Sequence, residues 1–157
     1  MTDVVLRDAV PGDAPELTAI AHAAKRHWGY PEEWIRLWGS SLTIMPAQVA
    51  AWYVPVARAG TRPVGFAALS TRGGLGELEH LWVLPEFMGR GIGGRLLARV
   101  RNRCAESACP VLRVVSDPHA AEFYEAQGGK RVAEEPSFPL PRVLPVLELS
   151  CPPQPGE

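Results

Sequence analysis

The feature that most constrains the fold is a cluster of four glycines within six residues, from Gly89 to Gly94, between a strand-like and a helix-like pattern. Such a cluster serves poorly as a mere connector, since Gly93 and Gly94 would each weaken the first helical turn by roughly 1 kcal/mol relative to alanine. Glycine lets the backbone approach a ligand closely, and the N-terminus of a helix carries partial positive charge. The sequence therefore predicts an anion site that suits a pyrophosphate.

Apolar runs with a period of two alternate with runs of helical period along the rest of the chain. We expect strands at residues 4–7, 52–58, 64–71, 77–84, 111–115, 131–133 and 143–149, and helices at 13–29, 31–38, 92–107 and 117–127. Asp13, with Glu16 three residues later, predicts a capping box at the first helix. The order βααβββαβαββ combines hairpins with crossovers, which predicts the α/β class with a mixed sheet.

The chain has 157 residues, which is the size of one domain. We place this domain at residues 1–151 and expect the proline-rich residues 152–157 to form a disordered tail. Sixteen basic and seventeen acidic residues give a net charge of −1, which argues against nucleic acid as a partner. The uncharged run 37–57 contains Pro46 and Pro55, so it is read as a helix end, a loop and a strand start, not as a membrane span.

The three cysteines are Cys104, Cys109 and Cys151. Their odd number and the absence of CxxC spacing favour neither a disulfide framework nor a zinc site, and a reducing compartment is the simpler expectation. His22 and His27 are five residues apart, which is not the spacing of a helical metal pair, so no metal is expected. Residues 1–3 lack the basic and apolar regions of a secretory signal, and the expected location is the cytoplasm.

The glycines at 89, 91 and 94 fit GxGxxG, the pattern of a dinucleotide-binding turn, which makes a nucleotide-dependent oxidoreductase one reading. Asp117, after the next strand, could then bind a ribose. Two features count against this reading. The connection 83–89 is long and contains Pro85, and only 63 residues follow Gly94, too few for the remaining strands of a doubly wound domain.

A more specific match exists over residues 81–97, which resemble the acetyl-CoA-binding motif of the GNAT superfamily of N-acetyltransferases. That motif is a strand ending in V-x-P, followed by Q/R-x-x-G-x-G/A at the start of a helix. Residues 117–128 are similar to the family's N-x-x-A-x-x-F/L-Y-x-x-x-G, and the order of elements agrees from residue 4 to 149. Three positions of this chain depart from the family pattern. Met88 stands where glutamine or arginine is usual, Asp117 where asparagine is common, and Gly129 where phenylalanine usually follows the glycine.

The resemblance implies that acetyl-CoA is the cosubstrate and that two segments hold it. The backbone of the strand would pair with the pantetheine arm, and the glycine loop would bind the pyrophosphate. A backbone N–H of the strand, that of Val83, would polarise the thioester carbonyl. The implied cofactor-binding residues are Leu81, Trp82, Val83, Met88, Gly89, Arg90, Gly91, Ile92, Gly93, Gly94 and Asp117.

The resemblance also implies direct attack of an amine on the thioester, which needs a base for the ammonium and an acid for the thiolate. Glu79 is the first candidate for the base, Glu77 the second and His80, on the other face of the strand, the third. Tyr124 occupies the family's position for the acid. The alternatives are that the two glutamates are ordinary surface charges and that Tyr124 is a core residue with a satisfied hydroxyl.

The expected acceptor is an amine of a small molecule or a peptide, and the protein would be a monomer or a homodimer. Four aromatic residues cluster in the first two helices, namely Trp28, Tyr30, Trp34 and Trp38. In the family this region lines the acceptor pocket, but simple core packing explains the cluster equally well. The rival function on the same fold is a non-catalytic module that binds or senses acyl-CoA.

Overall fold

The computed structural model describes residues 3–152, so most of the expected tail lies outside the described residues. The strands are β1 (Val4–Asp8), β2 (Pro55–Ala59), β3 (Arg62–Arg72), β4 (Leu75–Val83), β5 (Val111–Val115), β6 (Lys130–Pro136) and β7 (Val143–Ser150). The helices are α1 (Ala14–His27), α2 (Glu32–Leu37), α3 (Pro46–Ala51), α4 (Ile92–Glu106) and α5 (Ala121–Ala126), with 3₁₀ turns η1 (Pro11–Asp13), η2 (Pro85–Phe87) and η3 (Pro118–Ala120).

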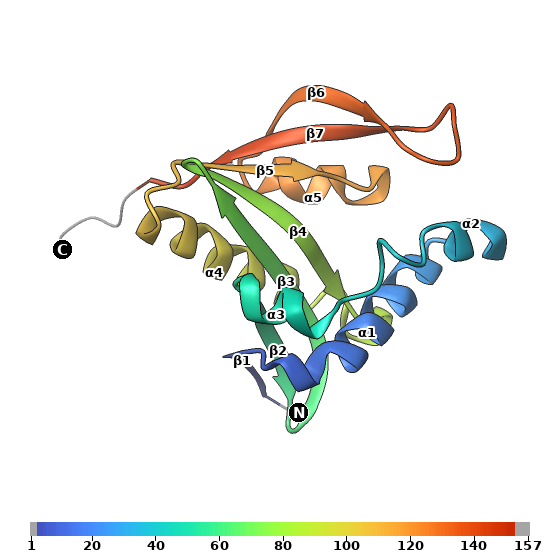
Figure 1. The fold of residues 1–157 in the computed structure, drawn as a ribbon, viewed down its shortest axis with the longest axis horizontal. Coiled ribbons are helices and arrows are strands. Elements are labelled where there is room, and N and C mark those ends of the chain that lie inside the picture. The colour runs from blue at the N-terminus through green and yellow to red at the C-terminus, as the bar shows by residue number, and fades with distance from the viewer. Residues whose placement is uncertain (1–2, 153–157) are drawn as a thin grey trace. The chain divides into compact units, whose positions relative to one another are not determined.

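The strands form one sheet in the order β1-β2-β3-β4-β5-β7-β6 (Figure 1). β1, β2 and β3 pair antiparallel, as do β5, β7 and β6, whereas β4 and β5 run parallel. Helix α4 connects these two parallel strands, as a crossover requires. The α/β class with a mixed sheet is confirmed.

The chain divides into two compact units. The first runs through Leu69 and includes His80–Val100. Its buried residues form continuous runs in β2 and β3, which is typical of strands covered on both faces, and recur with helical spacing on α1 and on the first turns of α4. They include Leu17, Ile20, Val56, Val64, Phe66, Leu69, Leu96 and Leu97.

The second unit consists of Ser70–Glu79 and the chain from Arg101 onward. Its core includes Leu112 and Val114 of β5 and Leu147 and Leu149 of β7, which face one side of the sheet at every second position. The three cysteines are all buried and free in this unit.

Helix α3 was not expected, because residues 37–57 were read as a helix end, a loop and a strand start. Pro46 stands in its first turn, where a missing N–H costs nothing. The Gln48 side chain accepts the N–H of Met45 at 2.8 Å and so closes the turn. These are local signals, but in the sequence Pro46 is read as evidence of a loop. Within residues 3–152 no helix is long and apolar enough to cross a membrane.

The expected capping box of Asp13 and Glu16 is wrong. The Asp13 carboxylate closes η1 instead, by accepting the N–H of Val10 at 2.9 Å, and it pairs with Arg58 of β2 at 3.0 Å. Pro15 occupies the second position of α1 and has no N–H for a cap to accept. The Asp13 carboxylate thus pairs with Arg58, which is distant in the sequence, and does not cap α1.

The departure from the family pattern at Gly129 has a structural reason. A Cβ at this position would lie 2.8 Å from the backbone oxygen of Tyr124, closer than real side chains come. The same oxygen accepts the N–H of Gly129 at 2.9 Å. The turn from α5 into β6 is therefore too tight for phenylalanine.

Candidate active site

The glycine loop lies between β4 and α4. Gly89 and Gly91 have φ angles of 78° and 79°, a left-handed backbone that other residues rarely adopt. Both are exposed, and an added Cβ at either would meet nothing within 4 Å. Open space thus faces the backbone where helix α4 begins, and the N–H groups of this segment can approach an anion. The observed geometry fits a phosphate group.

Two arginines brace the approach to this loop. The Arg90 guanidinium carbon lies 4.7 Å from the centre of the Phe87 ring, and that of Arg62 lies 5.7 Å from it. Arg62 also pairs with the Glu86 carboxylate at 3.1 Å, and Arg90 donates to the Glu86 carbonyl at 3.0 Å. Arg62 therefore links the segment before the glycines to β3 at the protein surface.

The strand residues expected to meet the pantetheine arm, 81–83, are half-buried in β4. Their position depends on Gly65 of β3, because a Cβ there would lie 3.1 Å from the Trp82 carbonyl and 3.3 Å from the Val83 side chain. A glycine at this point lets the two strands lie unusually close together.

His80, the third candidate for the base, is ill suited to it. Burial lowers its pKa to about 4, so the imidazole is neutral at physiological pH. The Trp82 indole donates to His80 Nδ1 at 3.0 Å. Because an indole N–H can only donate, Nδ1 is the acceptor and the proton lies on Nε2. No lone pair is left to take a second proton from an amine.

Glu77 and Glu79 have different environments. Glu77 lies opposite Arg113 in the ladder of β4 and β5, and their side chains pair at 3.4 Å. Arg113 also pairs with Glu135, which makes Glu77 one member of a three-residue ion network. Glu79 is exposed, and the Ser70 hydroxyl donates to its carboxylate at 2.6 Å. Glu79 is the more accessible of the two carboxylates.

The ladder between β4 and β5 is short. Three pairs form it, from Leu75 with Val111 to Glu77 with Arg113, and no further pair occurs in the part of the chain that is described. β5 itself continues to Val115, where it still pairs with β7. β4 has therefore parted from β5 by Glu79.

Tyr124 lies on α5 with only 6% of its surface exposed. Burial raises the pKa of its hydroxyl, and the charge of Asp117 raises it further. Among residues 3–152 the hydroxyl has no hydrogen-bond partner, yet every fully buried polar side-chain atom there has one. The ring is therefore buried while its hydroxyl reaches accessible space.

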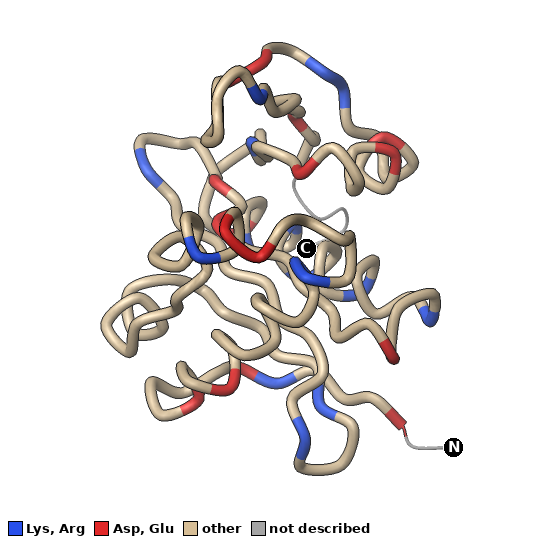
Figure 2. Tube along the Cα trace, turned by 90° about the vertical axis from the view of Figure 1, so that its right-hand side faces the viewer, with Lys and Arg blue, Asp and Glu red and all other residues tan. Residues whose placement is uncertain are grey.

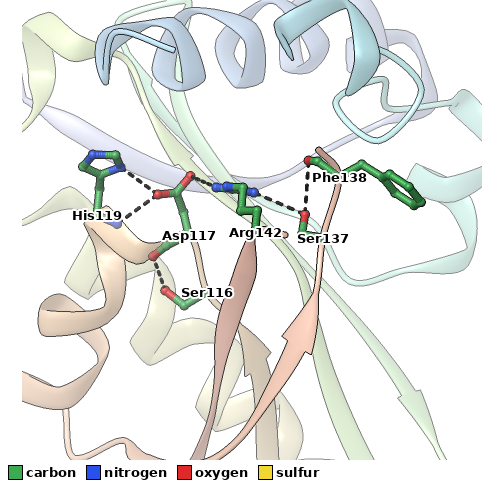
Figure 3. Close-up of polar contacts among 6 residues, drawn as sticks. All are labelled: Ser116, Asp117, His119, Ser137, Phe138 and Arg142. Atoms are coloured by element: carbon green, nitrogen blue, oxygen red, sulfur yellow. Dashed lines mark hydrogen bonds and ion pairs between the residues drawn. The ribbon is translucent and has the colours of Figure 1, made fainter. Parts of the chain in front are cut away.

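Asp117 holds the start of the α5 segment, as Figure 3 shows. Its carboxylate accepts the backbone N–H of His119 at 2.9 Å and lies 2.9 Å from the His119 ring nitrogen. Arg142 pairs with it at 3.6 Å and donates to the Ser137 hydroxyl at 3.2 Å. The side chain thus caps η3 and ties it to the hairpin loop between β6 and β7. The expected single helix 117–127 is divided at this cap into η3 and α5.

Sequence reasoning missed three residues that contact the candidate groups, namely Ser70, Arg113 and Arg142. Arg113 could have been found, because a parallel pairing of the two strands places it near Glu77. Ser70 and Arg142 had no sequence signal, since their partners depend on strand register and on the fold of a hairpin loop.

Comparison with known families gives one match, to the acetyltransferase (GNAT) domain over residues 45–138. No curated protein sequence matches the chain. The match covers more than half of the sequence, and the chain belongs to the GNAT family. The family and the observed fold make the protein an acyltransferase.

Solved structures agree on the fold. The PaiA N-acetyltransferase of Thermoplasma acidophilum, in complex with coenzyme A, has a TM-score of 0.78 at 18% identity, covering 94% of this chain and 99% of its own. A GCN5-related N-acetyltransferase of Rhodopseudomonas palustris has a TM-score of 0.77 at 24% identity, and the alignment covers 96% of this chain and 98% of that one. The ribosomal-protein-S18-alanine N-acetyltransferase of Escherichia coli has a TM-score of 0.72 at 16% identity, and the alignment covers 99% of this chain and 97% of that one.

His80 makes stability depend on pH. Its pKa is about 4 in the folded protein and about 6.5 in an unfolded chain, so the unfolded state takes up the extra proton on acidification. The stability contributed by the neutral imidazole is complete above pH 6.5 and is lost as the pH falls towards 4. His80→Asn keeps an acceptor near the Nδ1 position and does not titrate.

Urea unfolding of both proteins across this range should show the wild type losing up to about 3 kcal/mol more than His80→Asn between pH 6.5 and 4. Parallel loss of stability in the two proteins would contradict a buried neutral His80.

Proposed function

We propose that the protein transfers an acetyl group from acetyl-CoA to an amine by direct attack of the amine on the thioester. The observation that carries this proposal is the glycine loop, where Gly89 and Gly91 turn left-handed backbone towards open space at the start of α4. A chain that needed only a connector there would not keep residues that weaken the helix. The cofactor-binding residues remain those of the sequence prediction.

The chain's own groups would act as follows. The N–H groups of 88–94 bind the pyrophosphate, the backbone of 81–83 binds the pantetheine arm, and the N–H of Val83 polarises the carbonyl. The amine nitrogen bonds to the carbonyl carbon and the carbon–sulfur bond breaks. The proton of the amine passes to Glu79, and the departing sulfur takes the proton of Tyr124.

The surroundings of the two glutamates support the choice of Glu79. Proton acceptance by Glu77 would break its ion pair with Arg113. Glu79 accepts a hydrogen bond from Ser70 and has no such ion pair among the described residues. Glu79 is exposed, so the proton can leave to solvent after each turnover.

The state of Tyr124 supports its role as the acid. A raised pKa keeps the phenol protonated throughout the physiological range. Its hydroxyl has no partner among the described residues, so it can donate to the sulfur without breaking an existing bond.

The first prediction concerns the cosubstrate and tests the function directly. Coenzyme A at about 100 times its dissociation constant should stabilise the protein by roughly 2.7 kcal/mol, whereas NAD should not. Gly91→Glu should abolish the shift, because it places bulk and negative charge on the phosphate site and strains a φ of 79°. Gly12→Glu is the matched control, since that position is also open and has an ordinary φ.

Thermal-shift titration with coenzyme A measures the stabilisation of both variants. Release of free thiol from acetyl-CoA with a panel of amines measures turnover. Binding of coenzyme A without release of thiol from acetyl-CoA in the presence of any of the amines would favour the non-catalytic module instead. A response to NAD alone would favour the oxidoreductase.

The second prediction separates the two carboxylates. Glu79→Gln keeps the shape and can still accept from Ser70, but it cannot take a proton. Turnover should fall by about 10²–10⁴-fold, with little change in the affinity for acetyl-CoA. Glu77→Gln is the matched control and should chiefly lower the melting temperature. Steady-state rates decide the matter, and the reverse pattern would assign the base to Glu77.

The third prediction is that Tyr124→Phe lowers turnover by about 10²-fold and leaves stability nearly unchanged. The ring and its packing are kept, and no hydrogen bond of the folded protein is lost, because the hydroxyl has no partner within residues 3–152. Turnover and melting temperature are measured on one sample. Full activity with a lowered melting temperature would exclude Tyr124 from the mechanism.

A further inference from the structure

Strand β6 forms one edge of the sheet and is almost fully accessible. It is the last strand in the sheet order, so among the described residues it pairs with β7 on one side and with no strand on the other (Figure 1). Six of its seven residues are exposed, and Glu135 is half-buried. An uncovered edge presents backbone N–H and C=O groups that can bind another strand.

The charges of β6 are arranged in two blocks of opposite sign. The strand reads Lys-Arg-Val-Ala-Glu-Glu-Pro from Lys130 to Pro136, with two cations at its start and two anions before its end. A strand that runs antiparallel to a copy of itself brings its start beside the end of the copy. The charges of β6 are therefore complementary to those of its own copy.

The register of the ladder with β7 determines which face of the sheet each charge occupies. Lys130 lies opposite Glu148, and Glu135 lies opposite Leu144. Alternate residues of β7 face the same side, and residues that lie opposite each other share a face. Lys130 and Glu135 are therefore on one face of the sheet. Positions 131 and 134 lie opposite 147 and 145, so these two charges share the other face.

This placement depends on an extra residue in the middle of β6. From Arg131 to Ala133 the strand advances by two residues while β7 advances by one, so Val132 forms a bulge. In a regular strand, residues separated by an odd number lie on opposite faces, and Lys130 could not share a face with Glu135. The bulge thus brings one cation and one anion to each face.

We propose that a second copy of the chain pairs antiparallel with the uncovered edge of β6, with the two-fold axis directly after the bulge. Lys130 then lies opposite Glu135 of the second copy, and Arg131 lies opposite Glu134 of the second copy. The symmetry forms each pair twice, and the members of every pair share a face of the joined sheet. Opposite charges directly across a ladder stabilise it, whereas like charges destabilise it. This dimer is independent of the proposed function.

A single register satisfies charge and face together. A shift of the second copy by one residue would place Lys130 opposite Glu134 or Pro136, which both lie on the other face. A shift by two residues would remove all of the ion pairs. Charged residues, a bulge and a proline discourage pairing of an edge with an arbitrary strand, so these features of β6 favour its own copy over other partners.

Each proposed ion pair contains one charge that lacks a partner in its own chain. Within residues 3–152 the side chains of Lys130 and Glu134 form no ion pair or hydrogen bond. Arg131 and Glu135 already pair with charged side chains of their own chain. The dimer therefore supplies a partner to the two unpaired charges and extends two existing pairs.

The loop after β6 adds apolar surface to the same edge. Phe138 and Leu140 of this loop are both exposed. Because the paired strands are antiparallel, the loop of one copy lies near the start of β6 in the other. The second copy can therefore cover apolar surface that water would otherwise meet.

Complementary substitutions test the pairing. Arg131→Glu places like charges opposite each other twice in a dimer of that variant, and so does Glu134→Lys. Each variant alone should dimerise about 10- to 100-fold more weakly than the wild type. In an equimolar mixture of the two variants, every cross-strand pair of the heterodimer again joins opposite charges, so the wild-type affinity should return.

Two controls separate this register from a general effect of charge. Glu16→Lys makes the same change of charge at an exposed position of α1 and should leave dimerisation unchanged. A mixture of Arg131→Glu with Glu135→Lys should not regain affinity, because its heterodimer still places like charges opposite each other at two positions.

Sedimentation equilibrium measures the dissociation constants, and circular dichroism shows that each variant is folded. The wild-type dimer should weaken several-fold between about 50 mM and about 500 mM salt, because the ion pairs are exposed. If Arg131→Glu does not fold, Lys130→Glu mixed with Glu135→Lys tests the same register.

Three results would overturn the inference. A wild type that stays monomeric at about 0.5 mM would leave the edge to a strand of another protein. A dimer that the single variants retain would have its interface elsewhere. A complementary mixture that stays monomeric would exclude the proposed register.

Discussion

The short parallel ladder between β4 and β5 is the constraint on which the candidate site depends. Three residue pairs hold β4 against its neighbour, and the ladder ends at Glu77. The two glutamates differ for this reason, since Glu77 lies inside the ladder, opposite an arginine, and Glu79 lies beyond it. The rest of β4 then passes Glu79 and Trp82 and reaches the glycine loop, so the proposed base and the segments proposed to bind the cosubstrate follow the end of the ladder.

Periodic patterns and glycine positions predicted most of the fold. All seven strands were found, and so were the helices that have a clear apolar face, because burial on one side imposes a period that the sequence displays. α3 was missed because Pro46 suggested a loop, although proline is tolerated in the first turn of a helix. The cap at Asp13 was wrong because Arg58, forty-five residues away, takes the carboxylate. Acidic and basic residues are interspersed along the trace (Figure 2), so charge could not have marked the elements.

The residue types of the candidate site were evident in the sequence, but their environments were not. The motif indicated Tyr124, yet whether its hydroxyl was satisfied depended on the packed structure. The alternation of β4 separated Glu77 and Glu79 from His80, yet the ranking of the two carboxylates rests on the partners Arg113 and Ser70. The aromatic residues of the first two helices were noticed, but the stacking of Trp34 on Tyr30, with ring centres 5.8 Å apart, depends on the packed structure.

The ion pair of Asp117 and Arg142 has a consequence for how sequences of this kind can diverge. An aspartate at the position where asparagine is common carries a charge that is mostly buried, and an arginine from a distant hairpin loop balances it. Replacing the aspartate by asparagine removes a negative charge that balances Arg142, and replacing the arginine removes a positive charge that balances Asp117. The two positions are therefore coupled in evolution, and a lineage leaves this arrangement at lower cost through a paired substitution than through either change alone.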